Sequence, residues 1–123
     1  MRKKFITTLL MMCLFAFNSY AGNISYIKQD GNYYHLNDSY KKTYKIVCVR
    51  GTRLVDYSSS LFIVEDGSYL YIYNDNGNRL NVLDKRKTGN CKKVFESSFT
   101  TEKDGYIREY NYRGTQYKIV GKK

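Results

Sequence analysis

Residues 61–77 read LFIVEDGSYLYIYNDNG, and this stretch decides the fold class. Two runs rich in aromatic and β-branched residues lie on either side of Asp66-Gly67, and Asn76-Gly77 follows the second run. Such residues suit a pleated, half-buried surface. Asp-Gly and Asn-Gly tolerate the positive φ angles of tight hairpins. The stretch therefore predicts two antiparallel strands joined by a tight turn, with a second turn after them.

The same turn signal recurs along the chain. It occurs three times, as Asp30-Gly31, Asp66-Gly67 and Asp104-Gly105. The spacing is 36 and then 38 residues, which is typical of repeat architectures. We therefore predict a three-fold internal repeat, with units over 24–50, 60–85 and 94–121. The alternative is chance similarity within a meander that is rich in Tyr and Lys.

Short strand-like runs separated by turn residues continue to the end of the chain, without a sustained helical stripe. Strands that follow one another through tight turns usually pair as neighbours. We therefore predict an all-β fold, an antiparallel meander of about eight to nine short strands. Covering the strand edges favours a small barrel or a two-sheet sandwich. Residues 22–123 are enough for a single small domain.

The first 21 residues have the order of a secretory signal peptide. Three basic residues precede an apolar run over 5–17, and the small residues Ser19 and Ala21 follow. This order predicts a helical signal peptide over 1–21, cleaved after Ala21. The apolar run has about 13 residues, fewer than the roughly 20 of a transmembrane helix. We expect a secreted or periplasmic protein without a transmembrane segment; the alternative is a buried N-terminal helix.

The chain is strongly basic, with 21 Lys and Arg against 11 Asp and Glu and a formal net charge of +10. Five cations gather between two predicted strands, at Lys85, Arg86, Lys87, Lys92 and Lys93. A basic stretch without acids is a candidate docking site for an acidic protein or for a polyanion such as an envelope glycan, a lipid or a nucleic acid. The alternative is a solvated loop that guards a strand edge.

Alternation along the strand puts Tyr69, Tyr71 and Tyr73 on one face, with Leu70 and Ile72 on the other. A row of tyrosines is a candidate face for stacking sugar rings or bases. The alternative is ordinary cross-strand packing, which stabilises hairpins by up to about 1 kcal/mol per pair. The sequence does not decide between the two.

Two cysteines, Cys48 and Cys91, remain after the leader, because Cys13 lies inside the predicted signal peptide. An even number of cysteines in an exported chain favours a disulfide. We therefore predict a Cys48–Cys91 disulfide. Two unpaired, buried thiols are the alternative.

No catalytic motif is present. The sequence has one His and lacks a nucleophile elbow, a zinc-protease motif, a phosphate loop and a dinucleotide fingerprint. We therefore predict no catalytic residue, no cofactor and no bound metal, and a non-enzymatic binding protein of the cell envelope or extracellular space. A nuclease-like hydrolase with His35 as general base is one alternative, and a barrel that carries a small ligand is another. The sequence leaves the oligomeric state open.

Overall fold

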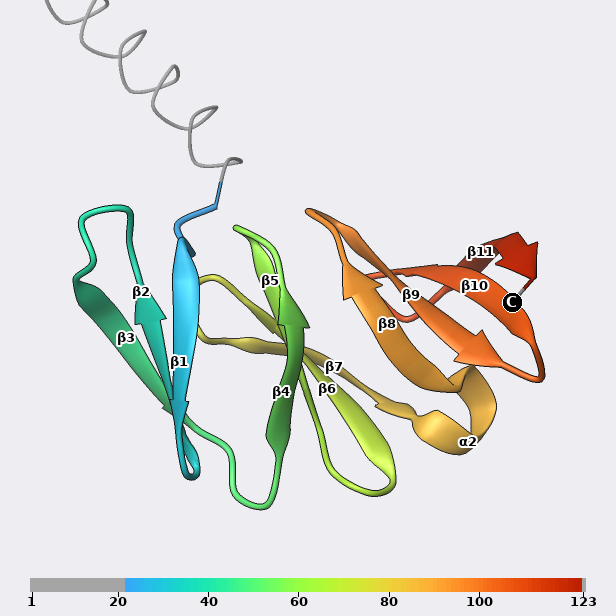
Figure 1. Cartoon of the computed structure of the whole chain (residues 1–123), viewed down its shortest axis with the longest axis horizontal. Coiled ribbons are helices and arrows are strands. Elements are labelled where there is room, and N and C mark those ends of the chain that lie inside the picture. The colour runs from blue at the N-terminus through green and yellow to red at the C-terminus, as the bar shows by residue number, and fades with distance from the viewer. Residues whose placement is uncertain (1–21, 123) are drawn as a thin grey trace, which may run out of the picture.

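The computed structural model describes residues 22–122, and this part of the chain is all-β (Figure 1). Eleven short strands form three antiparallel meander sheets. The first sheet contains β1 (Tyr26–Asp30), β2 (Tyr33–Asn37) and β3 (Thr43–Cys48). The second contains β4 (Arg53–Tyr57), β5 (Leu61–Glu65), β6 (Tyr69–Asn74) and β7 (Arg79–Asp84). The short helix α2 (Lys85–Thr88) leads to the third, which contains β8 (Asn90–Val94), β9 (Ser98–Lys103), β10 (Tyr106–Asn111) and β11 (Gln116–Lys122).

The predicted antiparallel all-β meander is confirmed, but the described strands form no closed barrel. The hydrogen-bonded ladder stops after β3 and again after β7, because the chain leaves the sheet through residues 49–52 and then through α2. Each break starts a new meander, and its first strand contacts the first strand of the preceding sheet. The predicted barrel is therefore wrong, three sheets replace the two of a sandwich, and the strands outnumber those expected.

The second sheet is buried on both faces, which explains how three short sheets share a core. All residues of β5 are buried. Because side chains alternate along a strand, Phe62 and Val64 pack on the first sheet, whereas Leu61 and Ile63 pack on the third. A continuous apolar run is the pattern of a strand covered on both sides. The second sheet therefore lies between the other two and packs on one face of each, while the outer faces of the first and third sheets remain open.

Aromatic ring pairs line both interfaces. Phe62 stacks on Tyr73 of the neighbouring strand, with ring centroids 5.0 Å apart, and Tyr34 of the first sheet lies 6.2 Å from Phe62. In the third sheet Phe99 stacks on Tyr110 at 5.6 Å. Such pairs contribute about 0.5–1.5 kcal/mol beyond their buried area. The stacked pairs stabilise the contact between neighbouring strands, and the Tyr34–Phe62 pair stabilises the contact between the first and second sheets.

One hairpin in each sheet closes with the same side-chain contact. A carboxylate oxygen of Asp38 accepts hydrogen bonds from the backbone N–H groups two and four residues later, at 2.9 and 3.1 Å. Asn74 and Asn111 make the corresponding pairs of bonds in the second and third sheets. Asp and Asn stabilise turns in this way, so each hairpin closes without proline. The internal repeat over 24–50, 60–85 and 94–121 stays a prediction.

The predicted signal peptide, residues 1–21, lies outside the described residues. Directly after it, the Asn23 side chain and backbone N–H both donate to the Asp75 carboxylate, at 3.0 and 3.1 Å. Ile24 is buried and donates to the Ser59 carbonyl at 3.0 Å. These bonds tie the start of the first sheet to the second. Within residues 22–122, no helix has the length and apolar character that a membrane crossing requires.

Candidate functional site

The stack of sheets has an open face at each end. The second sheet is covered on both sides, whereas the first and third sheets are each covered on one side only (Figure 1). Side chains on the two outer faces are therefore available to a partner. The faces differ in the pairing of their charges, and that difference identifies the candidate site.

On the outer face of the third sheet, acids pair with two of the cations. Lys92 forms an ion pair with Glu102 at 3.5 Å, and Lys118 forms one with Glu109 at 3.2 Å. The Ser98 hydroxyl also donates to Glu109, at 2.8 Å. Paired surface charges leave little net field for a charged partner. A polar outer face is typical of the capping end of a stacked array.

The outer face of the first sheet, called the first-sheet face below, draws on all three strands. The strand register places Lys28 opposite His35, and His35 opposite Ile46. The alternating residues Tyr34 and Leu36 are buried against the second sheet, so the intervening side chains lie on the open side. The face comprises Tyr26, Lys28, Asp30, Tyr33, His35, Asn37, Thr43, Ile46 and Cys48.

Large apolar side chains are exposed on the first-sheet face. Ile46 is 52% exposed, Tyr33 51% and Tyr26 39%. Lys28 is exposed beside them, and Lys41 is exposed in the turn between β2 and β3. Neither lysine forms an ion pair with any residue of 22–122. The face therefore offers apolar contact area beside two lysines that form no ion pair among the described residues, with Asp30 as an acid on the same face.

A hollow of about 260 Å³ lies in the first-sheet face. Asn37, which is buried, accepts a hydrogen bond from the Thr43 hydroxyl at 2.6 Å and donates one to the His35 carbonyl at 2.9 Å. The Thr43 bond joins β3 to β2 beside the hollow, and the His35 bond holds the Asn37 amide along β2, so the sheet fixes the shape of the hollow there. The lining residues are Tyr26, Lys28, Asp30, His35, Asn37, Lys41 and Thr43.

The turn between β2 and β3 brings Lys41 to the hollow. The Asp38 carbonyl accepts a hydrogen bond from the Lys41 N–H at 3.0 Å, while the Asp38 carboxylate holds two further N–H groups of the turn. Lys41 has a φ of 64°, which is uncommon for a residue with a side chain. Such a conformation persists where surrounding bonds impose it. The turn therefore fixes the Lys41 backbone beside the hollow.

The three tyrosines predicted as a stacking face do not share an open surface. Tyr73 is buried in the core against Phe62. Tyr71 is half-buried, and its hydroxyl donates to the Asp66 carboxylate at 2.6 Å. Only the third of them, Tyr69, is exposed. The alternation is as predicted, but the first sheet packs on this side, so the three tyrosines do not form one open surface.

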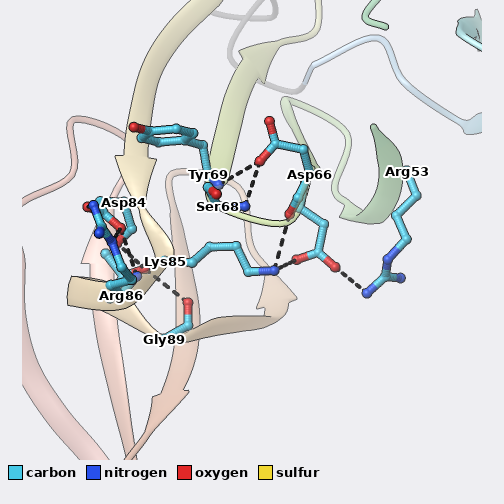
Figure 2. A network of polar contacts seen from close by, with 10 residues as sticks. Arg53, Asp66, Ser68, Tyr69, Asp84, Lys85, Arg86 and Gly89 are labelled. Carbon is cyan, nitrogen blue, oxygen red and sulfur yellow. Dashed lines mark hydrogen bonds and ion pairs between the residues drawn. The ribbon is translucent and has the colours of Figure 1, made fainter. Parts of the chain in front are cut away.

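In the basic stretch predicted as an anion-docking site, individual cations form ion pairs with different acids. Lys85 contacts the Glu65 carboxylate at 3.1 Å, and Arg53 approaches the same carboxylate from β4 (Figure 2). Arg86 pairs instead with Asp84, at 2.9 Å. A hollow of about 400 Å³ lies beside Glu65, and its lining contains cations that are already paired with acids. This network is therefore better suited to stability than to anion binding.

The remaining cations of the stretch also do not form a patch. Lys92 pairs with Glu102, and Lys93 lies over the Phe95 ring, 5.5 Å from its centroid. Lys87 is exposed on α2. Acids thus pair with three of the five predicted cations, and two of these acids, Glu65 and Glu102, lie in other strands. The stretch does not form one open positive surface.

His35 lies in the first-sheet face and lines its hollow together with Asp30. No residue of 22–122 forms a hydrogen bond or ion pair with the His35 ring, Asp30 included. A general base of this type requires an orienting partner. Within the same range, no group of three His, Cys, Asp or Glu side chains is placed to hold a metal ion. His35 therefore enters the site as one polar group among several.

The predicted disulfide is not formed, and both cysteines are free. Cys48 is exposed on the first-sheet face, at the end of β3. Cys91 is buried between the second and third sheets. The second sheet lies between the two thiols, and this separation prevents the bridge. The sequence did not reveal this separation, because the number of cysteines shows which pairing is possible and not how far apart the two thiols lie in the fold.

Cys48 should react with a maleimide in the folded protein, whereas Cys91 should react only after unfolding. Burial, with smaller contributions from Asp56 and Glu65, raises the pKa of the Cys91 thiol to about 12. At pH 8 about one such thiol in ten thousand is ionised, and the thiolate is the reactive form. Brief labelling with and without guanidinium, read by mass spectrometry, checks this. Equal labelling of both residues in the folded state, or a mass that shows a bridge, would contradict the structure.

Part of the first-sheet face was visible in the sequence. Alternation groups Tyr33, His35 and Asn37 on one side of a strand, and the same rule groups Tyr26 with Lys28. Sequence reasoning did not show that this side stays open while the tyrosine side of the second sheet is covered.

Comparison with known proteins finds no matching family model, no similar curated protein and no similar solved structure.

Proposed function

We propose that the protein is an exported, non-enzymatic binding module that docks an anionic glycan of the cell envelope on the first-sheet face. The N-terminal sequence supports export, because its order of charged, apolar and small residues is that of a signal peptide. The excess of Lys and Arg supports an anionic partner, since a net positive field raises the encounter rate with polyanions.

One observation carries the proposal: exposed Tyr26, Tyr33 and Ile46 lie beside Lys28 and Lys41, which form no ion pair within residues 22–122. Tyrosine combines an apolar ring with a polar hydroxyl, which suits a surface that is apolar on one side and wet on the other. Sugar rings have the same mixed character. Unpaired lysines supply the attraction to the acidic groups of the glycan.

The size of the face favours a glycan over an acidic protein. A strand of five residues is about 17 Å long, and three strands span about 14 Å including their width. The face therefore covers roughly 240 Å². A stable protein interface needs about 800 Å² per partner. A sugar chain lying across the strands requires much less area. The alternative of a ligand-carrying barrel has no support, because the described strands form no closed barrel.

Binding to immobilised teichoic acid, a phosphate-linked glycan polymer, tests the proposal, with neutral dextran as the matched polymer. We expect the exported protein to bind teichoic acid and not dextran. Two lysine contacts to anionic groups predict a loss of roughly tenfold in affinity between 50 and 200 mM salt. Replacing both lysines, Lys28→Glu with Lys41→Glu, should weaken binding at least tenfold.

The control is a double variant of equal charge on another part of the surface, Lys87→Glu with Lys93→Glu. It should bind within about twofold of the unmodified protein, because a change in net charge alone acts mainly on the long-range field. If this control loses binding and the Lys28 and Lys41 variant retains it, the docking surface lies at the basic stretch instead. Equal binding to dextran, or capture only by acidic proteins, would overturn the glycan proposal.

A further inference from the structure

The hollow in the first-sheet face has two chemically different ends. Residues opposite each other in the register form three successive rows, Asp30 with Tyr33, Lys28 with His35 and Tyr26 with Asn37. Lys41 lies in the turn beyond the last row. Lys41 therefore lies at the turn end, Lys28 lies in the middle row, and the Asp30 carboxylate lies at the opposite end.

Hydrogen-bond donors outnumber acceptors at the lysine end. Each ammonium group of Lys28 and Lys41 carries three donors and no acceptor, and the Tyr26 hydroxyl and the His35 ring each supply a further N–H or O–H. The Thr43 hydroxyl already donates to Asn37, so it can only accept from a ligand. A group with several acceptor oxygens and negative charge complements this end. A tetrahedral oxyanion meets that requirement better than a carboxylate, which has two oxygens.

The Asp30 end needs the opposite chemistry. A carboxylate accepts hydrogen bonds and repels an anion, so this end suits hydroxyl donors. Tyr26, which lines the hollow and is 39% exposed, offers a ring for apolar contact in the row next to the turn. A sugar ring has both hydroxyl donors and apolar C–H faces. The volume of about 260 Å³ exceeds what a single oxyanion fills.

Resting on the proposed function, we infer that the hollow binds one sugar unit that carries a phosphate or sulfate group. The oxyanion lies between Lys28 and Lys41 beside Tyr26, the sugar ring extends across the row of Lys28 and His35, and ring hydroxyls donate to Asp30. Recognition of this unit makes the first-sheet face selective among anionic glycans. Polymers whose acidic groups are carboxylates alone, such as hyaluronate, then bind weakly.

Calorimetric titration of the exported protein with glucose 1-phosphate tests the inference, with glucose, inorganic phosphate and glucuronate as comparisons. We expect glucose 1-phosphate to bind at least tenfold more tightly than each of these. Lys41→Ala should weaken the binding of glucose 1-phosphate and of inorganic phosphate by the same factor. Asp30→Asn should remove most of the preference for glucose 1-phosphate over inorganic phosphate, because it removes the acceptor for ring hydroxyls. Circular dichroism confirms that each variant is folded.

The outcomes separate this inference from the proposed function. Equal affinity for inorganic phosphate and glucose 1-phosphate would overturn the sugar part and identify a phosphate site. Equal affinity for glucuronate would overturn selectivity for a tetrahedral oxyanion. If teichoic acid binds and the Lys28 and Lys41 variant loses it, while no small probe binds, the inference fails and the proposed function stands. If teichoic acid does not bind either, both fail.

Discussion

Replacing Lys85 by methionine is expected to destabilise the protein by about 3 kcal/mol or more. The Lys85 side chain is only 17% exposed and contacts Glu65, which is 7% exposed, at 3.1 Å. It also donates to the Asp66 carbonyl at 3.3 Å. Removing one member of a buried ion pair leaves the other charge uncompensated in a region of low polarity. Arg53 also approaches Glu65, but its side chain is largely exposed and compensates incompletely.

Arg86→Met is the matched control for this substitution, since it removes the neighbouring cation in the same way. Arg86 pairs with Asp84 at the surface, with 81% of its side chain exposed (Figure 2). Exposed pairs contribute little to stability, so the control should destabilise the protein much less than Lys85→Met does. Urea unfolding curves of both variants provide the comparison. Equal losses for the two would show that the Lys85–Glu65 pair is no more important than a surface pair.

Gly89→Ala is expected to cost about 3 kcal/mol or more, because two unfavourable terms add. Gly89 ends α2 with a φ of 87°, where a residue with a side chain is strained by about 1–3 kcal/mol. An added Cβ would also lie 2.2 Å from the Glu102 carbonyl oxygen, so the backbone of β9 would have to move. Such overpacking adds about 1–3 kcal/mol.

Gly105→Ala separates the two terms. Gly105 has a similar φ of 81°, but a Cβ there would meet no atom within 4 Å. This substitution should therefore show the conformational cost alone, about 1–2 kcal/mol. Both variants can be compared by chemical unfolding of the same preparation. A Gly89 variant that is as stable as the Gly105 variant would mean that α2 and β9 are not packed as closely as described.

Local sequence chemistry predicted the hairpins around its turn signals, although eleven strands and the short helix α2 form where eight to nine strands were expected. The Asp66-Gly67 turn and the runs on either side of it form the β5–β6 hairpin, with Phe62 opposite Tyr73 as neighbours. Turn residues and the runs beside them predict a hairpin because its two strands are adjacent in the sequence. The division into three sheets could not be predicted in the same way. It depends on where the ladder stops, at residues 49–52 and at α2, and these breaks are set by packing between sheets.

The site was harder to predict than the fold, for a related reason. Lys85 and Lys92 looked like unpaired cations because the acids that neutralise them, Glu65 and Glu102, lie in other strands. Tyr73 looked accessible to a ligand, because alternation shows on which side of the strand a residue lies but not whether another sheet covers that side. Lys28, by contrast, lies in an unremarkable stretch of sequence and becomes part of a site because the first sheet has no neighbour on that side.

Mapping of backbone amide chemical shifts during a titration with teichoic acid tests most directly whether the first-sheet face is the docking surface. Isotope-labelled protein over residues 22–123 is used at low salt and again at high salt. The expected changes lie in β1, β2 and the turn that contains Lys41, and they shrink when salt is added. Changes confined to residues 85–93 or to the third sheet, or no changes at all, would contradict the proposal.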